Sequence, residues 1–155
     1  MTKYVALLRG ISPAYPNMRN EKLRHVFTSL GFTNIQTVIS SGNVIFETRM
    51  SSQQTLEEKI EKAVFEMLGF QSTVIIRSRE DLEKLIKSDP FKDKMDAPRS
   101  RLNVSFLKKG GEIFSRVDFT STTTPEIMKN IEKEHGKGVT TRTWKTVLRI
   151  VSKLN

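Results

Sequence analysis

The chain has 155 residues, no cysteine, and a formal net charge of +9 from 26 Lys and Arg against 17 Asp and Glu. Its length suits one domain, or two small halves that share a core. The lack of cysteine excludes disulfides, thiolate nucleophiles, iron–sulfur clusters and thiolate zinc sites. The apolar run after Met1 is too short for a signal peptide, and no stretch approaches the ~20 apolar residues of a membrane span. We therefore expect a cytoplasmic protein without a membrane partner.

Positive charge is concentrated late in the chain. Residues 1–76 hold 8 basic and 6 acidic side chains, whereas residues 77–155 hold 18 and 11. From Lys137 to the end there are five basic residues and no acid. Such a distribution attracts anions and favours phosphate-bearing partners, more so at low salt. The alternative interpretation is that the charge serves only solubility.

Hydrophobic periodicity divides the first half of the chain into strand, helix, strand, strand, helix and strand. In chain order the segments are the strand 4–8, the helix up to Leu30, the hairpin strands 34–39 and 44–46, the helix 55–69 and the strand 73–76. The first strand is apolar on both alternating faces, which is typical of a strand covered on both sides. The second helix begins with a capping-box pattern of Thr55 and Glu58. The order predicts a ferredoxin-like α+β fold, in which two helices back a four-stranded antiparallel sheet.

This topology brings two polar corners of the first half together. Strands one and two are predicted to be parallel, with strand three antiparallel between them. The end of strand one then lies at the same edge as the turn 40–43, whose last two residues tolerate positive φ. We therefore expect Arg9 to be a neighbour of Asn43. Gly10 and Ser41 share this edge, which is a candidate anion-binding rim.

The second half is predicted to be a smaller α+β unit, residues 78–155, that packs on residues 1–77 as part of one compact unit. It begins with a helix capped by Ser78 and Asp81, which a connecting stretch, residues 89–100, follows. The hairpin strands 101–107 and 112–119 then turn at Gly110 and Gly111. Two helices end the chain, one from Thr124 and Pro125 to Gly136 and one from Thr141 to Leu154.

The last predicted helix is the clearest amphipath of the chain. At ~100° per residue, one stripe is basic: Arg142, Lys145, Arg149 and Lys153. The opposite side is apolar: Trp144, Val147, Leu148, Val151 and Leu154. Thr140 and Thr141 precede this helix, so their hydroxyls, free backbone N–H groups and Arg142 could converge on one phosphate. The alternative is that a threonine only caps the helix, Trp144 belongs to the core, and the basic stripe is solvated.

The sequence contains few residues that would support an enzymatic function, and we expect neither a metal nor a cofactor. His25 and His135 have no partners at metal-ligand spacing. Ser41 lacks the second glycine and the strand-to-helix turn of a nucleophile elbow. The sequence contains neither a Walker A motif nor GxGxxG. Tyr4 and Phe46 lie among aliphatic residues, so we interpret both as core and not as an RNA-binding platform.

Three spaced motifs resemble the signatures of one known family. They are YVALLRGI at residues 4–11, SSGNV at 40–44 and TTRTWKTV at 140–147. The family is an uncharacterised, mainly bacterial one, domain of unknown function 1697 (DUF1697), and the likeness runs along nearly the whole chain. The resemblance implies a cytoplasmic α+β protein whose first part is ferredoxin-like. It implies no catalytic residue, because the family has no established activity.

The chain also departs from that family. Similar members usually follow the first motif with Asn and two glycines, whereas residues 12–16 here read SPAYP. A phosphate cradle in this loop is disfavoured, because proline removes a backbone donor. Thr143 and Lys145 replace two usual asparagines. The segment between Leu107 and Glu112 is shorter than usual, which suggests that a helix and a strand are missing from the second half.

Three functions fit the sequence. The one we favour is a non-catalytic module that binds a phosphate-bearing partner, either nucleic acid or a nucleotide, through Arg142, Lys145, Arg149 and the rim. The second is a small enzyme that acts on an anionic metabolite at the rim of Arg9 and Asn43. The third is a protein-interaction domain.

Overall fold

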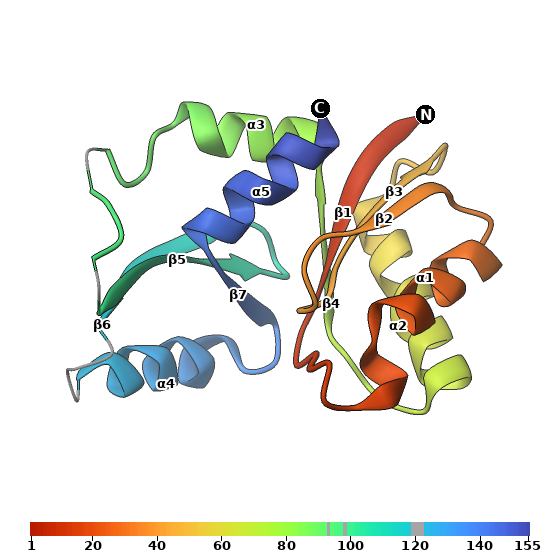
Figure 1. Cartoon of the computed structure of the whole chain (residues 1–155), viewed down its shortest axis with the longest axis horizontal. Coiled ribbons are helices and arrows are strands. Elements are labelled where there is room, and N and C mark those ends of the chain that lie inside the picture. Colours follow the sequence, from red (N-terminus) through yellow and green to blue (C-terminus); the bar gives the residue numbers. More distant parts are fainter. Residues whose placement is uncertain (93, 98, 119–122) are drawn as a thin grey trace.

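The structure is a computed structural model that describes residues 1–92, 94–97, 99–118 and 123–155. In chain order the elements are β1 (Thr2–Leu8), the 3-10 helix η1 (Pro16–Met18), α1 (Asn20–Ser29), β2 (Thr33–Thr37), β3 (Asn43–Thr48), α2 (Gln53–Leu68), β4 (Val74–Ser78), α3 (Arg79–Lys87), β5 (Ser100–Leu107), β6 (Glu112–Asp118), α4 (Thr123–His135), β7 (Val139–Thr143) and α5 (Trp144–Leu154) (Figure 1). No helix within these ranges is long and apolar enough to cross a bilayer.

The first half forms a four-stranded antiparallel sheet in the order β2-β3-β1-β4. The central strand β1 places Leu7 opposite Asn43 of β3 and opposite Ile75 of β4. Helices α1 and α2 cover one face of this sheet (Figure 1). The predicted ferredoxin-like α+β arrangement is confirmed.

The face under α1 and α2 is an aromatic and aliphatic core. The ring of Phe46 stacks on Tyr4, with ring centroids 5.7 Å apart, and on Phe32, with centroids 4.6 Å apart. Tyr4 and Phe46 are buried, and the Tyr4 hydroxyl donates to the carbonyl oxygen of Met50 at 3.0 Å. Both residues are therefore core, as predicted, and neither ring is exposed for a base to stack on.

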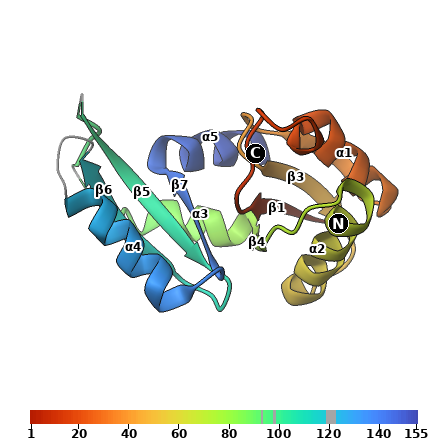
Figure 2. The ribbon, with the colours of Figure 1, turned by 90° about the horizontal axis from the view of Figure 1, so that it is seen from below.

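The opposite face of the first sheet is covered by α3 and α5, which lie between the two sheets (Figures 1 and 2). One buried cluster contains residues of both sheets and both helices: Val5, Leu7, Ile45 and Ile75 of the first sheet; Leu82 and Leu85 of α3; Leu102, Val104 and Phe106 of β5; and Val147, Ile150, Val151 and Leu154 of α5. Each fully buried aliphatic side chain contributes about 1.5–3 kcal/mol. This shared layer explains why β1 is apolar on both faces.

The second half forms a three-stranded antiparallel sheet in the order β6-β5-β7. The β5–β6 hairpin turns at Gly110 and Gly111, as predicted. Helix α4 packs on the outer face of this sheet, where Ile131 contacts Leu107 and Val139 in a small core. The two sheets are thus each covered on the outside by their own helices and share α3 and α5 between them.

Strand β7 is the main correction to the predicted elements. Residues 139–143 were expected to lead into the last helix and begin it, but they pair with β5, so that Arg142 lies opposite Val104. Four of these five residues are β-branched, which favours a strand. Helix α5 therefore begins at Trp144. Its N-cap is Thr143, whose hydroxyl accepts from the Thr146 N–H at 3.2 Å.

Three local predictions about helix ends have different outcomes. The capping box of Ser78 and Asp81 at the start of α3 is confirmed. The one predicted for Thr55 is wrong, because Ser52 is the N-cap of α2 and accepts from the Thr55 N–H at 3.2 Å. Helix α4 already begins at Thr123, so Thr124 lies inside the helix instead of capping it.

Candidate anion-binding site

The rim predicted at the end of β1 contains a buried arginine. Arg142 extends from β7 into this corner, and only 8% of the residue is exposed. Its five hydrogen-bond acceptors are the side chains of Asn43 (2.6 Å) and Thr140 (2.8 Å) and the carbonyl oxygens of Leu8 (2.9 Å), Thr141 (3.0 Å) and Gly42 (3.2 Å). A guanidinium has five N–H donors. All of them are therefore used inside the protein.

The three family-like motifs meet at this arginine. Leu8 belongs to the first motif, Gly42 and Asn43 to the second, and Arg142 to the third, although Leu8 and Arg142 are separated by 134 positions. The two backbone corners do meet as predicted, since the Leu8 N–H donates to the Gly42 carbonyl oxygen at 2.9 Å. The corner is filled, however, and joins the first half of the chain to β7. We call this set of contacts the Arg142 joint.

The Arg142 joint holds a positive charge in the interior. Burial lowers the pKa of Arg142 to about 10, so the guanidinium remains charged at pH 7. Within the described part of the chain, no carboxylate forms an ion pair with it. The dipoles of carbonyl and amide oxygens compensate for the lost hydration instead. Because all five N–H donors of Arg142 are used inside the protein, none is available to bind a phosphate.

Asn43 and Ser41 also have roles within the joint. Asn43 is 1% exposed, and its Nδ2 donates to the Val38 carbonyl oxygen and to the Ser41 hydroxyl, both at 3.0 Å. Of the two turn residues that tolerate a positive φ, only Gly42 adopts one, at +81°, because Asn43 is the first residue of β3. These contacts hold the hairpin against β1 and Arg142.

Arg9 directs its side chain away from the Arg142 joint and toward the second half. Its Nη1 donates to the Val139 carbonyl oxygen at 2.8 Å, and its Nη2 forms an ion pair with Glu132 at 3.0 Å. The side chain is 29% exposed. The backbone segments of Arg9 and Asn43 thus lie close together at the same edge of the first sheet, but their side chains take part in different clusters.

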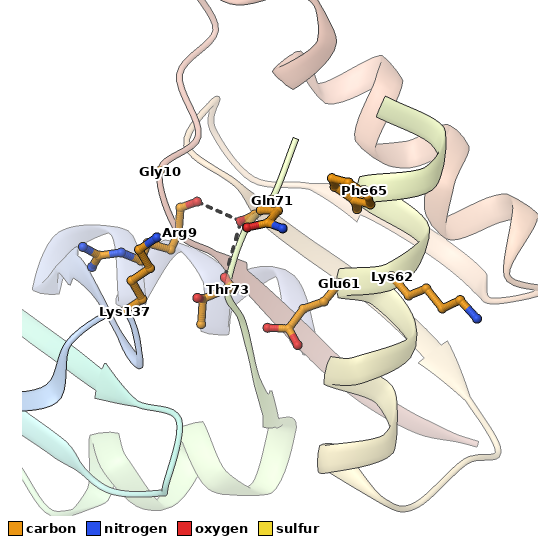
Figure 3. Close-up of a pocket in the computed structure, with 9 residues that line it drawn as sticks. Arg9, Gly10, Glu61, Lys62, Phe65, Gln71, Thr73 and Lys137 are labelled. Carbon is orange, nitrogen blue, oxygen red and sulfur yellow. Dashed lines mark hydrogen bonds between the residues drawn. The ribbon is translucent and has the colours of Figure 1, made fainter. Parts of the chain in front are cut away.

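Arg9 lines a pocket of about 540 Å³ between the two halves, which we call the Arg9 pocket (Figure 3). Its lining residues come from the end of β1, from α2, from the segment before β4 and from the α4–β7 loop: Arg9, Gly10, Glu61, Lys62, Phe65, Gln71, Ser72, Thr73 and Lys137. Figure 3 shows Arg9 and Lys137 on one side of the pocket and the α2 residues on the other. Gly10 is the other rim residue that belongs to this pocket.

The Arg9 pocket has an excess of positive charge. Arg9, Lys62 and Lys137 line it, and Glu61 is its one acidic residue. The Glu61 carboxylate is already compensated, because it accepts from the Lys108 ammonium at 2.5 Å and from the Val74 N–H at 2.9 Å. Lys137 is exposed, and no described residue forms a hydrogen bond or an ion pair with its ammonium. Arg9 is itself paired with Glu132, so among the described residues Lys62 and Lys137 carry the charges of the pocket that have no ion-pair partner, and these attract an anion.

Two acidic residues of α2, Glu57 and Glu61, have a structural role at the open edge of the first sheet. Glu61 accepts from Val74, and Glu57 accepts from the Ile76 N–H at 2.8 Å, so both carboxylates cover N–H groups of the edge strand β4. Burial raises the pKa of Glu57, although the Ile76 hydrogen bond and the nearby Lys108 act in the opposite direction. The hydrogen bond to the edge strand explains why Glu57 is buried, so no catalytic role is needed to account for it.

The basic stripe of α5 is shorter than predicted. Arg142 lies in β7 and is not part of it, whereas Lys145, Arg149 and Lys153 are exposed on the helix. The predicted convergence of Thr140, Thr141 and Arg142 at a helix N-terminus is wrong, because these three residues belong to a strand. Thr140 is buried in the joint, and the Thr141 hydroxyl lies 2.8 Å from that of Ser105.

The apolar side of α5 differs from the prediction at Leu148 and at Ile150, which was not predicted to belong to it. Its buried residues are Val147, Ile150, Val151 and Leu154, whereas Leu148 is 43% exposed. Successive helical residues are ~100° apart, so Leu148 lies at the edge of the arc that the four buried residues form, next to the exposed stripe.

Residues that the sequence analysis did not single out complete the Arg9 pocket. Lys137 belongs to the basic end of the chain, and Lys62 and Phe65 lie within the predicted helix 55–69 without being singled out. No sequence signal marks these residues, because their proximity to Arg9 arises from packing. Across the described residues, no group of three or more His, Asp and Glu side chains could hold a metal ion.

Comparison with known proteins gives a fold and a family. The solved structure of the conserved bacterial protein SP0830 from Streptococcus pneumoniae is similar, with a TM-score of 0.76 and 23% sequence identity over 99% of this chain and 98% of that one. No curated protein matches the chain. The family described as "Protein of unknown function (DUF1697)" matches residues 1–138, which include the first two motifs and end before the third. The chain belongs to this family.

Proposed function

We propose that the protein is a non-catalytic module that binds a phosphate-bearing anion in the Arg9 pocket. The observation that carries this proposal is the exposed ammonium of Lys137, which has no partner among the described residues and lies beside Arg9 in the pocket. Glu61 does not neutralise this charge, because it is paired with Lys108.

The groups of the Arg9 pocket suit phosphate oxygens. Arg9 uses only one N–H of each terminal guanidinium nitrogen for contacts with described residues, so the remaining N–H groups are available to a ligand. Guanidinium and ammonium groups both form short, charge-assisted hydrogen bonds to phosphate. The backbone N–H of Gly10 finds no acceptor among the described residues and is a further donor. Pockets of roughly 300–1,000 Å³ hold small organic ligands, so the volume is suitable.

The proposed contacts differ from those inferred from the sequence. Arg142, Asn43 and Thr140 are excluded because their polar groups are engaged in the Arg142 joint. Lys145 and Arg149 do not line the Arg9 pocket. They are proposed to act only over longer range, by attracting a polyanion such as nucleic acid to the surface of α5.

Replacing Lys137 by Ala is expected to weaken phosphate binding about fivefold, because one charge-assisted contact worth about 1 kcal/mol is lost. Inorganic pyrophosphate is the probe, titrated by calorimetry at low salt. The folded state is expected to be unchanged, since Lys137 is exposed and makes no hydrogen bond to a described residue.

The matched control is Lys59→Ala, which removes an exposed lysine of α2 that does not line the pocket. This variant is expected to bind pyrophosphate as the wild type does. Equal binding by wild type and Lys137→Ala, or no binding by the wild type, would argue against the proposed site.

A further inference from the structure

An aromatic ring lies across the Arg9 pocket from the cations. Phe65 of α2 lines this pocket and is 51% exposed, whereas its helical neighbour Val64 is fully buried. Figure 3 shows the ring on the side of α2 that faces Gln71, with Arg9 and Lys137 on the opposite side of the pocket. Among the described aromatic residues, none packs its ring against Phe65. The fold therefore makes little use of this side chain.

We propose that the anion bound in the Arg9 pocket is a nucleotide, whose base stacks on Phe65 and whose phosphate binds Arg9 and Lys137. This inference rests on the proposed function, because it needs the cationic side of the pocket. It adds the class of ligand: an aromatic base attached to a phosphate, as opposed to a sugar phosphate or an inorganic anion.

The chemistry of the pocket fits the two ends of such a ligand. Flat aromatic rings bind bases by stacking with little preference among them, because every base has a π-face. Gln71 is exposed and lines the pocket between Phe65 and Arg9, and its amide can both donate to and accept from the edge of a base. Proteins that bind single-stranded nucleic acid combine cations for the backbone with aromatic rings for the bases, and a nucleotide has the same two groups.

The Ser72 hydroxyl of the pocket is engaged within the protein. Ser72 is buried, and its hydroxyl donates to the Arg9 carbonyl oxygen at 2.8 Å. This hydrogen bond ties the end of β1 to the segment before β4. The phosphate is therefore expected on the side of Arg9 and Lys137, and the base on the side of α2.

The test compares adenosine 5′-monophosphate, ribose 5-phosphate and inorganic pyrophosphate, each titrated by calorimetry against the wild type and a Phe65→Leu variant. The wild type is expected to bind adenosine monophosphate about tenfold more tightly than ribose 5-phosphate, because only the former has a base to stack. Phe65→Leu should remove this tenfold preference and leave the affinity for ribose 5-phosphate unchanged.

Two further variants separate stacking from a general effect on the fold. Phe65→Trp keeps an aromatic face and is expected to retain the preference for adenosine monophosphate. Phe114→Leu makes the same truncation at a 41% exposed phenylalanine of β6, outside the Arg9 pocket, and is expected to bind as the wild type does.

The outcomes distinguish the two proposals. If both monophosphates bind wild type equally, or if Phe65→Leu keeps the preference, the nucleotide inference is overturned and the anion-binding proposal stands. If none of the three phosphates binds the wild type, both proposals fail.

Discussion

Arg142→Met is expected to lower the free energy of unfolding by about 3–5 kcal/mol. The variant removes all five hydrogen bonds of the guanidinium and leaves the carbonyl oxygens of Leu8 and Gly42 without that donor in the interior. Whole domains have unfolding free energies of only about 5–15 kcal/mol, so this loss is a large part of the total. Urea unfolding, followed through the fluorescence of Trp144, measures it.

Two variants show whether this effect belongs to the joint. Arg149→Met removes an exposed arginine of α5 and is expected to change stability by less than about 0.5 kcal/mol. Arg142→Lys keeps the charge but offers three donors in place of five, so it is expected to fall between wild type and Arg142→Met. An Arg142→Met variant as stable as Arg149→Met would show that the Arg142 joint does not hold the two halves together.

Gly42→Ala is expected to destabilise the protein by about 2–4 kcal/mol. Gly42 has a φ of +81°, and an added Cβ would lie 2.7 Å from Cγ1 of Ile11 and 3.0 Å from the Leu8 carbonyl oxygen. The left-handed conformation costs a residue with a Cβ roughly 1–2 kcal/mol, and relief of the clash adds a similar amount. The carbonyl oxygen of Gly42 also accepts from Arg142, so a shift of the turn disturbs the Arg142 joint.

Gly31→Ala is the matched control for Gly42→Ala. Gly31 has almost the same φ, +83°, but an added Cβ there meets no heavy atom within 4 Å. It is therefore expected to cost only the roughly 1–2 kcal/mol of the left-handed conformation. Chemical denaturation of both variants isolates the contribution of the clash, and equal losses would mean that the turn adapts freely.

Most of the first half could be predicted from the sequence, because its signals are local. Alternating apolar residues in β1 and helical spacing in α1 and α2 define the elements, and the right-handed crossovers leave one arrangement of the sheet. The pairing of Leu7 with Asn43 follows from that order. What the sequence could not show is which elements cover the second face of β1, because α3 and α5 come from a distant part of the chain.

The second half was harder to predict, because tertiary pairing overrides its local pattern. Residues 139–143 follow a glycine and precede a strongly amphipathic helix, so they resemble the start of that helix. Only the pairing of β7 with β5 reveals a strand. Once Arg142 was assigned to a helix face, it was expected to bind a phosphate or face solvent, whereas the strand directs it into the interior.

The geometry of the candidate site could likewise be predicted only in part from the sequence. The meeting of the two backbone corners could be predicted from topology alone, but the directions of the Arg9 and Asn43 side chains could not. Each direction depends on a partner far along the chain, the Val139 carbonyl oxygen for Arg9 and the Arg142 guanidinium for Asn43. Lys137 joins the Arg9 pocket only when the two halves pack together, whereas Phe65 reaches it through the packing of α2 on the first sheet. The division of the chain at residue 77 stays a prediction.

A crystal structure grown with adenosine 5′-monophosphate would show where the anion binds. Density for the phosphate is expected within hydrogen-bond distance of Arg9 and Lys137, with the Arg142 joint unchanged. A ligand bound elsewhere, for example on the α5 stripe, with the Arg9 pocket empty at saturating concentration, would contradict this expectation.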